Sequence, residues 1–361
     1  MPASIAPSVV AGPVPLPFNN AAAGDADADE LPQDPLVKEY AGAASALPSN
    51  PKLWLRRYQG TWVLEPWVPG IIAVQRGFVP RSGDVVLASA PKCGTTWLKA
   101  LAFATMARRA HPPSGSGHPL LRLNPHDCVP FMEKLFAAGW GRRMDALPSP
   151  RLMATHMHHS VLPASISDNP DCKIVYICRE AKDMVVSMWH FGRRMQPDLS
   201  FSDVFEAACD GRCLSGPIWD HVLGYWNASK ASPERVLFLR YEEMLRDPVG
   251  NVRRLARFVG QPFSLAEEEA GVVTDVVRLC SFETLKNLEV NRAASPQGAI
   301  RKGAFTNDSF FRRGEAGDWA NHMTPEMARR LDAIVEERLR GSGLSFLRSP
   351  TGDQPCIASC W

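Results

Sequence analysis

Residues 90–97 read Ala-Pro-Lys-Cys-Gly-Thr-Thr-Trp, and they separate two segments with clear apolar patterns. Before them, residues 84–90 (DVVLASA) form an apolar run with the length and composition of a buried strand. After them, residues 95–107 carry apolar side chains at helical spacing. The stretch therefore predicts a strand, a loop and a helix in direct succession, which is the repeating unit of an α/β fold.

A loop in this position is well placed to bind an anion, because the backbone N–H groups and the positive end of the helix dipole point at whatever lies in front of the helix. Gly94 lets the backbone approach closely, Lys92 adds a positive charge, and Thr95 and Thr96 add hydroxyl donors. Here the lysine precedes the only glycine, so the loop lacks the G-x-x-x-x-G-K-[ST] pattern of nucleotide triphosphatases. An ordinary turn whose lysine and threonines cap a helix stays open as the alternative.

Further apolar runs extend the pattern along the chain. Residues 173–179 (KIVYICR) and 236–241 (VLFLRY) have the character of buried strands, and residues 151–156 fit a shorter one. One helical pattern begins at Asp183, and another covers residues 324–340. Apolar strands that alternate with helices predict an α/β fold with a central parallel sheet flanked by helices on both faces. The predicted phosphate-binding loop would make this fold P-loop-like.

The composition predicts one folded region with extensions at both ends. The 361 residues are 45% hydrophobic, which is enough for one large domain. Residues 1–50 are rich in Ala, Pro and Gly without a periodic pattern, so we expect a disordered extension there. Residues 51–347 form the single expected domain, and residues 348–361 are expected to be a flexible tail.

The charge balance and the hydropathy argue against two classes of partner. The formal net charge of +2 gives no surface-wide basic field for nucleic acid. No apolar run approaches the roughly 20 residues that span a bilayer, and the acidic first segment lacks the features of a signal or transit peptide. The nine cysteines are scattered, odd in number and without zinc-site spacing, which predicts reduced thiols and no metal site. We therefore expect a cytoplasmic protein.

Two later blocks offer further positive groups for an anion. Arg179 ends a predicted strand, and Ser187 lies two helical turns into the helix that follows. Residues 311–319 (FRRGEAGDW) place two arginines before a glycine in a loop. The planar guanidinium group matches the oxygens of a phosphate. Taken alone, however, Arg179 also fits a surface residue paired with Asp183, and residues 311–319 also fit a solvated basic loop.

Together and in this order, the blocks resemble the signatures of the cytosolic sulfotransferases that use 3′-phosphoadenosine 5′-phosphosulfate (PAPS). The sequence PKCGTTWLKAL (91–101) resembles PKSGTTWLKAL, the family's loop for the 5′-phosphosulfate. The sequences CREAKDMVVS (178–187) and FRRGEAGDW (311–319) are similar to CRNPKDVAVS and RKGxxGDW, which grip the 3′-phosphate. The segments GPIWDHVLGYW (216–226) and SFETLKNLEVN (281–291) look most like the plant branch of the family.

The resemblance implies a set of residues that bind the cofactor. Stacking on the adenine would involve Trp97, Tyr241 and Phe282. Cys93 replaces the usual serine and offers a weaker donor, while Arg313 replaces the usual lysine and keeps the charge. The full implied set is Lys92, Cys93, Gly94, Thr95, Thr96, Trp97, Arg179, Ser187, Tyr241, Cys280, Phe282, Arg312, Arg313 and Gly314.

The resemblance also implies two catalytic residues, His156 and Lys92. His156 follows a threonine at the end of a predicted strand, where the family has its general base, and an imidazole with an ordinary pKa suits that task. Lys92 would stabilise the negative charge that develops on the leaving phosphate. Because such transfers depend on positioning and charge stabilisation, the lysine and the arginines would supply what is needed without a metal ion.

The acceptor is expected to be a small hydroxylated molecule of the kinds that the plant branch uses: a flavonoid, a phenolic or a hydroxylated plant hormone. Candidate apolar residues for its pocket are Phe131, Met132, Phe136, Trp140 and Met157. Residues 320–329 lack most of the dimer element of the animal members, which favours a monomer. Two other interpretations stay open, namely a P-loop nucleotide kinase or hydrolase and a PAPS-binding protein without turnover.

Overall fold

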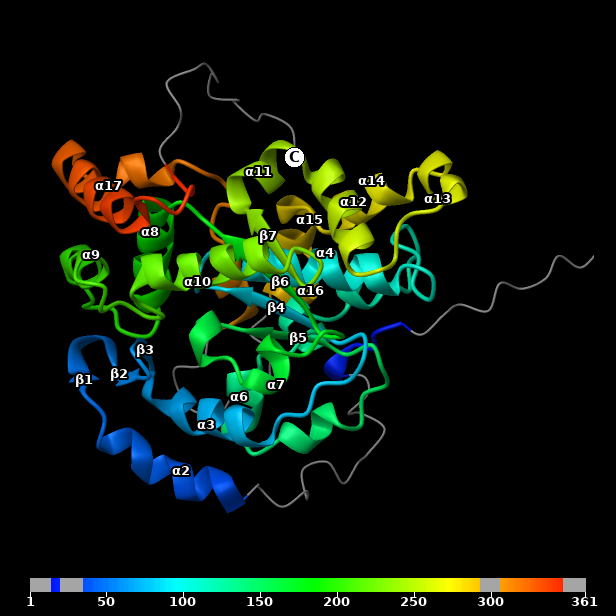
Figure 1. The fold of residues 1–361 in the computed structure, drawn as a ribbon. Helices are drawn as coiled ribbons and strands as arrows, with labels where there is room; N and C mark the ends of the chain where they lie inside the picture. Colours follow the sequence, from blue (N-terminus) through cyan, green and yellow to red (C-terminus); the bar gives the residue numbers. More distant parts are fainter. Residues whose placement is uncertain (1–13, 20–34, 293–305, 347–361) are drawn as a thin grey trace, which may run out of the picture.

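The computed structural model describes residues 14–19, 35–292 and 306–346. At its centre lies a four-stranded parallel sheet with the strand order β5-β4-β6-β7 (Figure 1). The strands are β4 (Val85–Ser89), β5 (Leu152–Thr155), β6 (Lys173–Cys178) and β7 (Val236–Arg240). Each of them lies within one of the four predicted runs, so the predicted fold class is confirmed.

The sheet divides the interior into two cores, because successive side chains of a strand point to opposite faces. In β4, Val86 and Ala88 belong to one hydrophobic cluster, whereas Val85 and Leu87 belong to the other. All four side chains are almost fully buried. A strand that is covered on both faces needs apolar residues at every position, which is why these strands appear in the sequence as continuous apolar runs.

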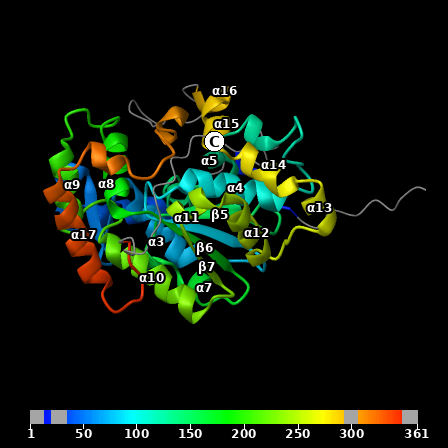
Figure 2. The same ribbon diagram turned by 90° about the horizontal axis from the view of Figure 1, so that it is seen from above.

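Helices cover both faces of the sheet, and α4 and α10 lie on opposite sides of the strands (Figure 2). The helices that contribute apolar residues to the core on the α4 side include α4 (Thr95–Ala107), α12 (Pro248–Phe258) and α14 (Val272–Leu279). Those that contribute to the second core include α3 (Val68–Gly77), α8 (Ala181–Gly192), α9 (Phe201–Cys209) and α10 (Ile218–Ala231). The predicted helical pattern over residues 324–340 corresponds to α17 (Pro325–Leu339), and the side chain of Thr324 caps its N-terminus.

Shorter elements complete the described fold. A small antiparallel sheet consists of β1 (Ser49–Asn50), β2 (Leu55–Tyr58) and β3 (Thr61–Leu64). The remaining α-helices are α2 (Pro35–Ser45), α5 (Pro125–Cys128), α6 (Met132–Ala137), α7 (Ala164–Ser167), α11 (Tyr241–Arg246), α13 (Leu265–Glu269), α15 (Phe282–Asn287) and α16 (Glu289–Arg292). Among the described residues, no helix combines the length and the apolar character that crossing a bilayer requires.

The predicted disordered extension over residues 1–50 is wrong for part of its length. Helix α2 places Tyr40 and Ala44 in the core, and the hydroxyl of Tyr40 accepts a hydrogen bond of 2.9 Å from Arg76 in α3. Phe18 is buried as well. Tyr40 and Ala44 are two core positions four residues apart, which is too sparse a pattern to predict a helix from the sequence. The predicted tail, residues 348–361, lies outside the described residues.

Candidate functional site

One cavity of about 1630 Å³ lies at the carboxyl ends of the parallel strands. Lys92 belongs to the loop after β4, and His156, Arg179 and Tyr241 directly follow β5, β6 and β7. All four residues line the cavity. Because parallel strands end at the same edge of a sheet, residues that are far apart in the sequence meet there. The order and direction of the strands therefore fix the position of this site.

The loop between β4 and α4 has a tight backbone that requires glycine at one position. Gly94 precedes α4 with a φ of 97°, and a Cβ atom there would lie 2.7 Å from Cδ2 of Tyr241. The hydroxyl oxygens of Ser89 and Thr95 are 2.6 Å apart, which ties the first turn of α4 to β4. No side chain caps the N-terminus of α4. Its first N–H groups are therefore available to an anion.

The surroundings of Lys92 disfavour its charge. Burial, followed by the charges of Arg179, Arg312 and Arg194, lowers the pKa of Lys92 to about 7. The Nζ atom lies 3.9 Å from the centre of the Phe191 ring. An anion among these positive groups would offset their mutual repulsion and favour the charged form of the lysine. The electrostatics of the site thus favour an anionic ligand.

Arg179 is a buried residue of the cavity wall, with only 8% of its side chain exposed. Its Nη2 atom donates to the carbonyl oxygen of Glu315 at 2.6 Å, and its guanidinium carbon lies 4.6 Å from the centre of the Tyr241 ring. Its Nε atom is buried and has no hydrogen-bond partner among the described residues. Ser187, further along α8, lines the same cavity. The alternative of a surface arginine is therefore wrong.

Asp183 connects the second sequence block to the third, which lies 134 residues further along the chain. Its Oδ2 accepts a hydrogen bond of 2.6 Å from the backbone N–H of Gly317, and its Oδ1 accepts one of 3.0 Å from that of Trp319. Its Oδ2 also lies 3.5 Å from Nη2 of Arg179. The sequence indicated Asp183 only as a partner of Arg179. The structure shows that it also holds the loop that carries Arg312.

Arg312 and Arg313 share one buried carboxylate, that of Asp318. Nη1 of Arg313 lies 3.0 Å from Oδ1, and Nη1 of Arg312 contacts Oδ2. Burial by itself would raise the pKa of Asp318, but the hydrogen bonds from Arg312 and Asn321 and the two positive charges lower it to about 2. Both arginines also line the cavity, so Asp318 orients the third block of the predicted site.

Aromatic rings from separate segments line another part of the cavity. Trp97 and Tyr241 meet edge to face, with ring centres 5.7 Å apart. Phe282 packs against Gly314, where φ is 74° and a Cβ atom would lie 2.5 Å from the ring. Cys280 lines the cavity close to Phe282 in the sequence. The residues that the sequence assigned to an adenine site therefore share one cavity with those assigned to the phosphates.

His156 is held in one tautomer. Its Nδ1 lies 2.8 Å from the carbonyl oxygen of Ser89, which only accepts, so the neutral ring has its hydrogen on Nδ1 and a lone pair on Nε2. The ring lies 4.5 Å from that of Phe131 and 6.0 Å from that of Trp67. Burial lowers the pKa of His156 to about 3 although the bond to Ser89 opposes this. The expected ordinary pKa of His156 is therefore wrong for the protein alone.

Glu133, which the sequence did not indicate, holds the segment around His156. It is fully buried; its Oε1 accepts a hydrogen bond of 2.8 Å from the backbone N–H of His156, and its Oε2 accepts one of 3.0 Å from the hydroxyl of Thr155. Burial raises the pKa of Glu133. A single carboxylate in a short helix carries no sequence signal, so only the tertiary contacts identify it.

A second buried network reaches the phosphate loop from α4 and α5. Nε2 of His126 lies 3.0 Å from Oγ1 of Thr96, and its Nδ1 lies 3.0 Å from Nζ of Lys99. Nζ of Lys99 also donates to the carbonyl oxygen of Val129 at 2.8 Å. Burial lowers the pKa of His126 well below its ordinary value, so the ring is neutral. This network was also missed, because its members lie up to 33 residues apart along the chain without a motif.

Cys93 departs from the predicted cofactor-binding set. It is 1% exposed and belongs to the hydrophobic core beneath the loop, whereas every other residue of that set lines the cavity. Burial raises the pKa of Cys93 to about 12, so its thiol is inert. The replacement of serine by cysteine therefore changes the core under the loop and leaves the cavity surface unchanged.

The apolar wall of the cavity also differs from the prediction. Of Phe131, Met132, Phe136, Trp140 and Met157, only Phe131 lines it. Met132 and Met157 point into the core, where each is at most 1% exposed. The apolar lining comes instead from the segment before α3 and from the second half of α8 and its continuation. Representative residues are Trp67, Met188, Phe191, Met195 and Leu199.

Comparison with known proteins adds independent findings. The family model of the sulfotransferase domain matches residues 82–343. The chain is 42% identical over 325 residues to cytosolic sulfotransferase 12 of Arabidopsis thaliana, covering 88% of this chain and 96% of the relative. It is 42% identical over 297 residues to the flavonol 4′-sulfotransferase of Flaveria chlorifolia, covering 81% and 90%.

Solved structures resemble this one over most of its length. An Arabidopsis thaliana sulphotransferase crystal structure is similar with a TM-score of 0.69 and 36% identity, covering 87% of this chain and 97% of the other. A mouse sulfotransferase complexed with PAP is similar with a TM-score of 0.61 and 26% identity, covering 80% and 95%. The family match and identities above 40% across most of the chain show that this protein belongs to the sulfotransferase family, alongside the plant cytosolic sulfotransferases.

Proposed function

We propose that this enzyme transfers the sulfuryl group of PAPS to a hydroxyl group of a small acceptor. The observation that carries the proposal is the convergence of Lys92, Arg179 and Arg312, from three distant segments, on one cavity that His156 also lines. A doubly phosphorylated nucleotide would satisfy these positive groups. The similarity to a mouse enzyme complexed with PAP, the product that PAPS leaves after transfer, supports the same nucleotide here.

The cavity suggests how the nucleotide would bind. The 5′-phosphosulfate would occupy the loop of Lys92, Gly94, Thr95 and Thr96 at the N-terminus of α4. The 3′-phosphate would contact the second and third blocks, through Arg179, Ser187, Arg312, Arg313 and the backbone at Gly314. The adenine would pack against the rings of Trp97, Tyr241 and Phe282 and beside Cys280, all of which line the cavity.

In the transfer, His156 would act as the general base, and Lys92 would stabilise the negative charge on the leaving group. The Nε2 lone pair of His156 takes the proton of the acceptor hydroxyl as the acceptor oxygen attacks sulfur. The bond between sulfur and the bridging phosphate oxygen breaks in line, and its electron pair stays on PAP. The ammonium of Lys92 stabilises that negative charge. The products are a sulfate ester, PAP and a protonated His156, which returns its proton to solvent.

The bound cofactor would also adjust the base. Burial and, to a smaller extent, the positive charges of Lys134, Lys99 and Lys92 lower the pKa of His156. The negative charges of the phosphosulfate and the 3′-phosphate offset those lysines, so the pKa of His156 rises when the nucleotide binds. The imidazole then becomes a stronger base at the step that needs it.

The acceptor would be a largely apolar molecule with one accessible hydroxyl group. The rings of Trp67 and Phe131 lie next to His156 in the wall of the cavity, and Met188 and Phe191 line the same cavity. Aromatic and thioether side chains of this kind suit flat ring systems. We therefore propose a flavonoid, a phenolic or a hydroxylated plant hormone as the acceptor class. The name of the Flaveria chlorifolia relative, which acts on flavonols, supports the first of these.

The test is a turnover screen with labelled PAPS against hydroxylated plant metabolites, together with PAP binding by calorimetry. We expect His156→Ala to lower kcat by about 10²–10⁴-fold and to leave PAP affinity unchanged. Lys92→Ala should lower both kcat and the affinity for PAP. His159→Ala is the matched control, because His159 does not line the cavity.

Three results would contradict the proposal. Full activity of His156→Ala would show that the base is wrong. PAP binding without turnover on any acceptor would favour a binding protein. Turnover of a nucleoside triphosphate that a chelator abolishes would favour a kinase or hydrolase.

A further inference from the structure

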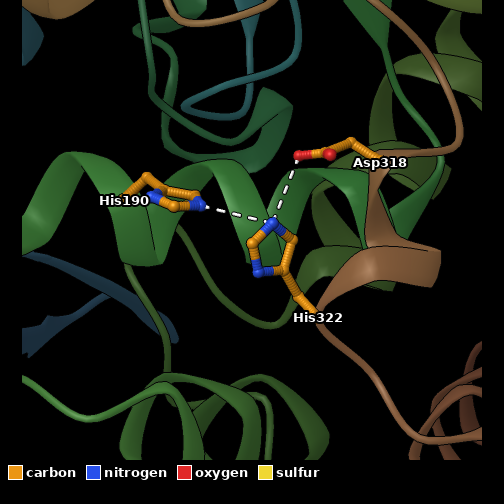
Figure 3. A group of neighbouring side chains, drawn as sticks. All are labelled: His190, Asp318 and His322. Carbon is orange, nitrogen blue, oxygen red and sulfur yellow. Dashed lines mark hydrogen bonds and ion pairs between the residues drawn. The ribbon is translucent and has the colours of Figure 1, made fainter.

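Three side chains with metal-binding atoms, none of which lines the large cavity, converge beside it. Nε2 of His190 lies 3.4 Å from Nε2 of His322, which lies 3.5 Å from Oδ2 of Asp318. The three atoms all lie within 4.8 Å of one another. His190 comes from α8 and His322 from the end of the segment that follows Gly317, and both rings point their Nε2 atoms toward the same place (Figure 3).

The spacing fits a tetrahedral metal ion. With metal–nitrogen bonds of about 2.0–2.1 Å, two imidazole nitrogens at a tetrahedral angle are about 3.3–3.4 Å apart. The nitrogens of His190 and His322 already have that separation. Oδ2 of Asp318 lies 3.5 Å from Nε2 of His322, so it can supply the third ligand on the same side. We propose that His190, Asp318 and His322 form a binding site for a zinc-class divalent ion.

The ligand set selects the class of metal. Two imidazoles and one carboxylate suit Zn²⁺, Co²⁺, Ni²⁺ and Cu²⁺, whereas Mg²⁺ and Ca²⁺ require oxygen ligands. In the absence of an ion, a neutral His322 has one ring hydrogen, so Nε2 can donate to only one of its two neighbours at a time. A divalent ion would bind all three atoms at once.

Neighbouring charges set the strength of the site. Arg312 and Arg313 already contact the carboxylate of Asp318, and two further arginines on the same side, Arg193 and Arg194, add positive charge. These groups oppose a cation, so the site is weaker than a dedicated structural zinc site. The imidazoles are within reach of solvent, because 23% of the His322 side chain is exposed and His190 is only partly buried.

The site shares Arg312 with the proposed nucleotide site. Arg312 and His190 line one small hollow together with Lys92, Ser187 and Arg194. An ion that takes Oδ2 of Asp318 frees Arg312 for a phosphate and adds positive charge beside it. Ion and nucleotide should therefore strengthen each other's binding, and by linkage the effect is reciprocal. This consequence rests on the proposed function.

The site itself is tested with tag-free protein and Co²⁺ alone. Four-coordinate Co²⁺ with nitrogen and oxygen ligands gives visible d–d bands, which we expect to saturate at one ion per chain and to disappear when Zn²⁺ is added. His322→Phe keeps an aromatic ring beside Trp189, and it should weaken Co²⁺ binding by at least about tenfold. His190→Phe should do the same, and circular dichroism checks that both variants are folded.

The matched control is His111→Ala, which breaks another histidine pair, His111 and His118. It should leave the Co²⁺ spectrum and affinity unchanged. Wild-type protein without saturable d–d bands, or bands that persist in His322→Phe, would overturn the site. Intense near-ultraviolet charge-transfer bands would assign the ion to a cysteine thiolate and would overturn it as well.

The coupling is tested by calorimetry of PAP with and without Zn²⁺. In the wild type, we expect Zn²⁺ to increase the affinity for PAP by at least about fivefold. In His322→Phe, the affinity for PAP should be the same with and without Zn²⁺. This variant also controls for direct binding of Zn²⁺ by the nucleotide. Unchanged PAP affinity in the wild type would overturn the coupling. No PAP binding under any condition would instead overturn the proposed function.

Discussion

At the residue scale, the charge of Lys92 depends on the groups that surround it. Burial and three neighbouring arginines lower its pKa to about 7. A nucleotide with several negative charges would raise that pKa again. Nucleotide binding is then accompanied by the uptake of a proton at any pH between the pKa of Lys92 in the free protein and its pKa in the complex.

The first prediction concerns the pH dependence of PAP binding. Because the pKa of Lys92 is lower in the free protein than in the complex, PAP affinity should fall as the pH rises from 7 to 9, by up to about tenfold per pH unit. This range lies above the phosphate pKa of about 6. Calorimetry in buffers of different ionisation enthalpy measures the proton uptake. In Lys92→Met the affinity for PAP should be lower, and PAP binding should no longer take up a proton. If the proton uptake is unchanged in this variant, the proton goes to a group other than Lys92.

The hydroxyl of Thr96 gives a second prediction, which concerns the network of Lys99 and His126. Lys99 has a hydrogen for Nδ1 of His126, so the neutral ring would donate from Nε2 to Oγ1 of Thr96. The hydrogen of Thr96 itself is then directed to an acceptor in the cavity. Thr96→Val and Lys99→Met should each weaken PAP binding several-fold, and the double variant should be no weaker than Thr96→Val alone.

Calorimetry on the four proteins of this cycle separates the explanations. If the losses of PAP affinity in the two single variants add up in the double variant, Lys99 affects PAP binding independently of Thr96. If Thr96→Val has no effect, Thr96 does not bind the nucleotide.

At the scale of elements, α8 positions two of the three blocks that line the cavity. Arg179 precedes its first residue, and Ser187 lies within it. Its Asp183 accepts hydrogen bonds from the backbone of residues 317 and 319 and thereby fixes the loop with Arg312 and Arg313. One buried carboxylate in the first turn of a helix therefore aligns positive groups that the chain separates by more than 130 residues.

The third prediction is that Asp183→Asn loosens this alignment. The amide keeps the shape but has one acceptor oxygen in place of two and no charge for Arg179. The free energy of unfolding should fall by about 1–3 kcal/mol, and PAP affinity should fall by about tenfold. The matched control is Glu206→Gln, which breaks an exposed ion pair with Arg330 and should change neither quantity. If Asp183→Asn is less stable but binds PAP with normal affinity, Asp183 stabilises the fold without aligning the nucleotide-binding residues.

At the scale of the whole molecule, the sheet separates a core that contains α4 from one that contains α3 and α8, and the cavity opens where the strands end. Helix α2 packs on α3 and contributes no lining residue to the cavity. This helix therefore supports the fold and not the chemistry.

The fourth prediction follows from this position. Deletion of residues 1–46 removes Tyr40 and Ala44 from the core, and it should lower the free energy of unfolding by about 2–4 kcal/mol. Turnover at a temperature where the shortened protein is folded should be unchanged. Tyr40→Phe, which removes only the hydrogen bond with Arg76, should cost about 1 kcal/mol. Equal stability of the full and shortened chains, measured by urea unfolding, would restore the original expectation of a disordered extension.

The sequence by itself determined the four buried strands, their alternation with helices and the identity of the three blocks, because apolar periodicity and short motifs are local properties of the chain. It did not indicate Glu133, His126 with Lys99, or the part that Asp183 plays in holding the third block. These residues act through single hydrogen bonds to distant segments, and such contacts leave no pattern in the sequence. The tertiary structure also decided that Cys93 faces the core and which apolar residues line the cavity, since burial depends on how the segments pack against one another.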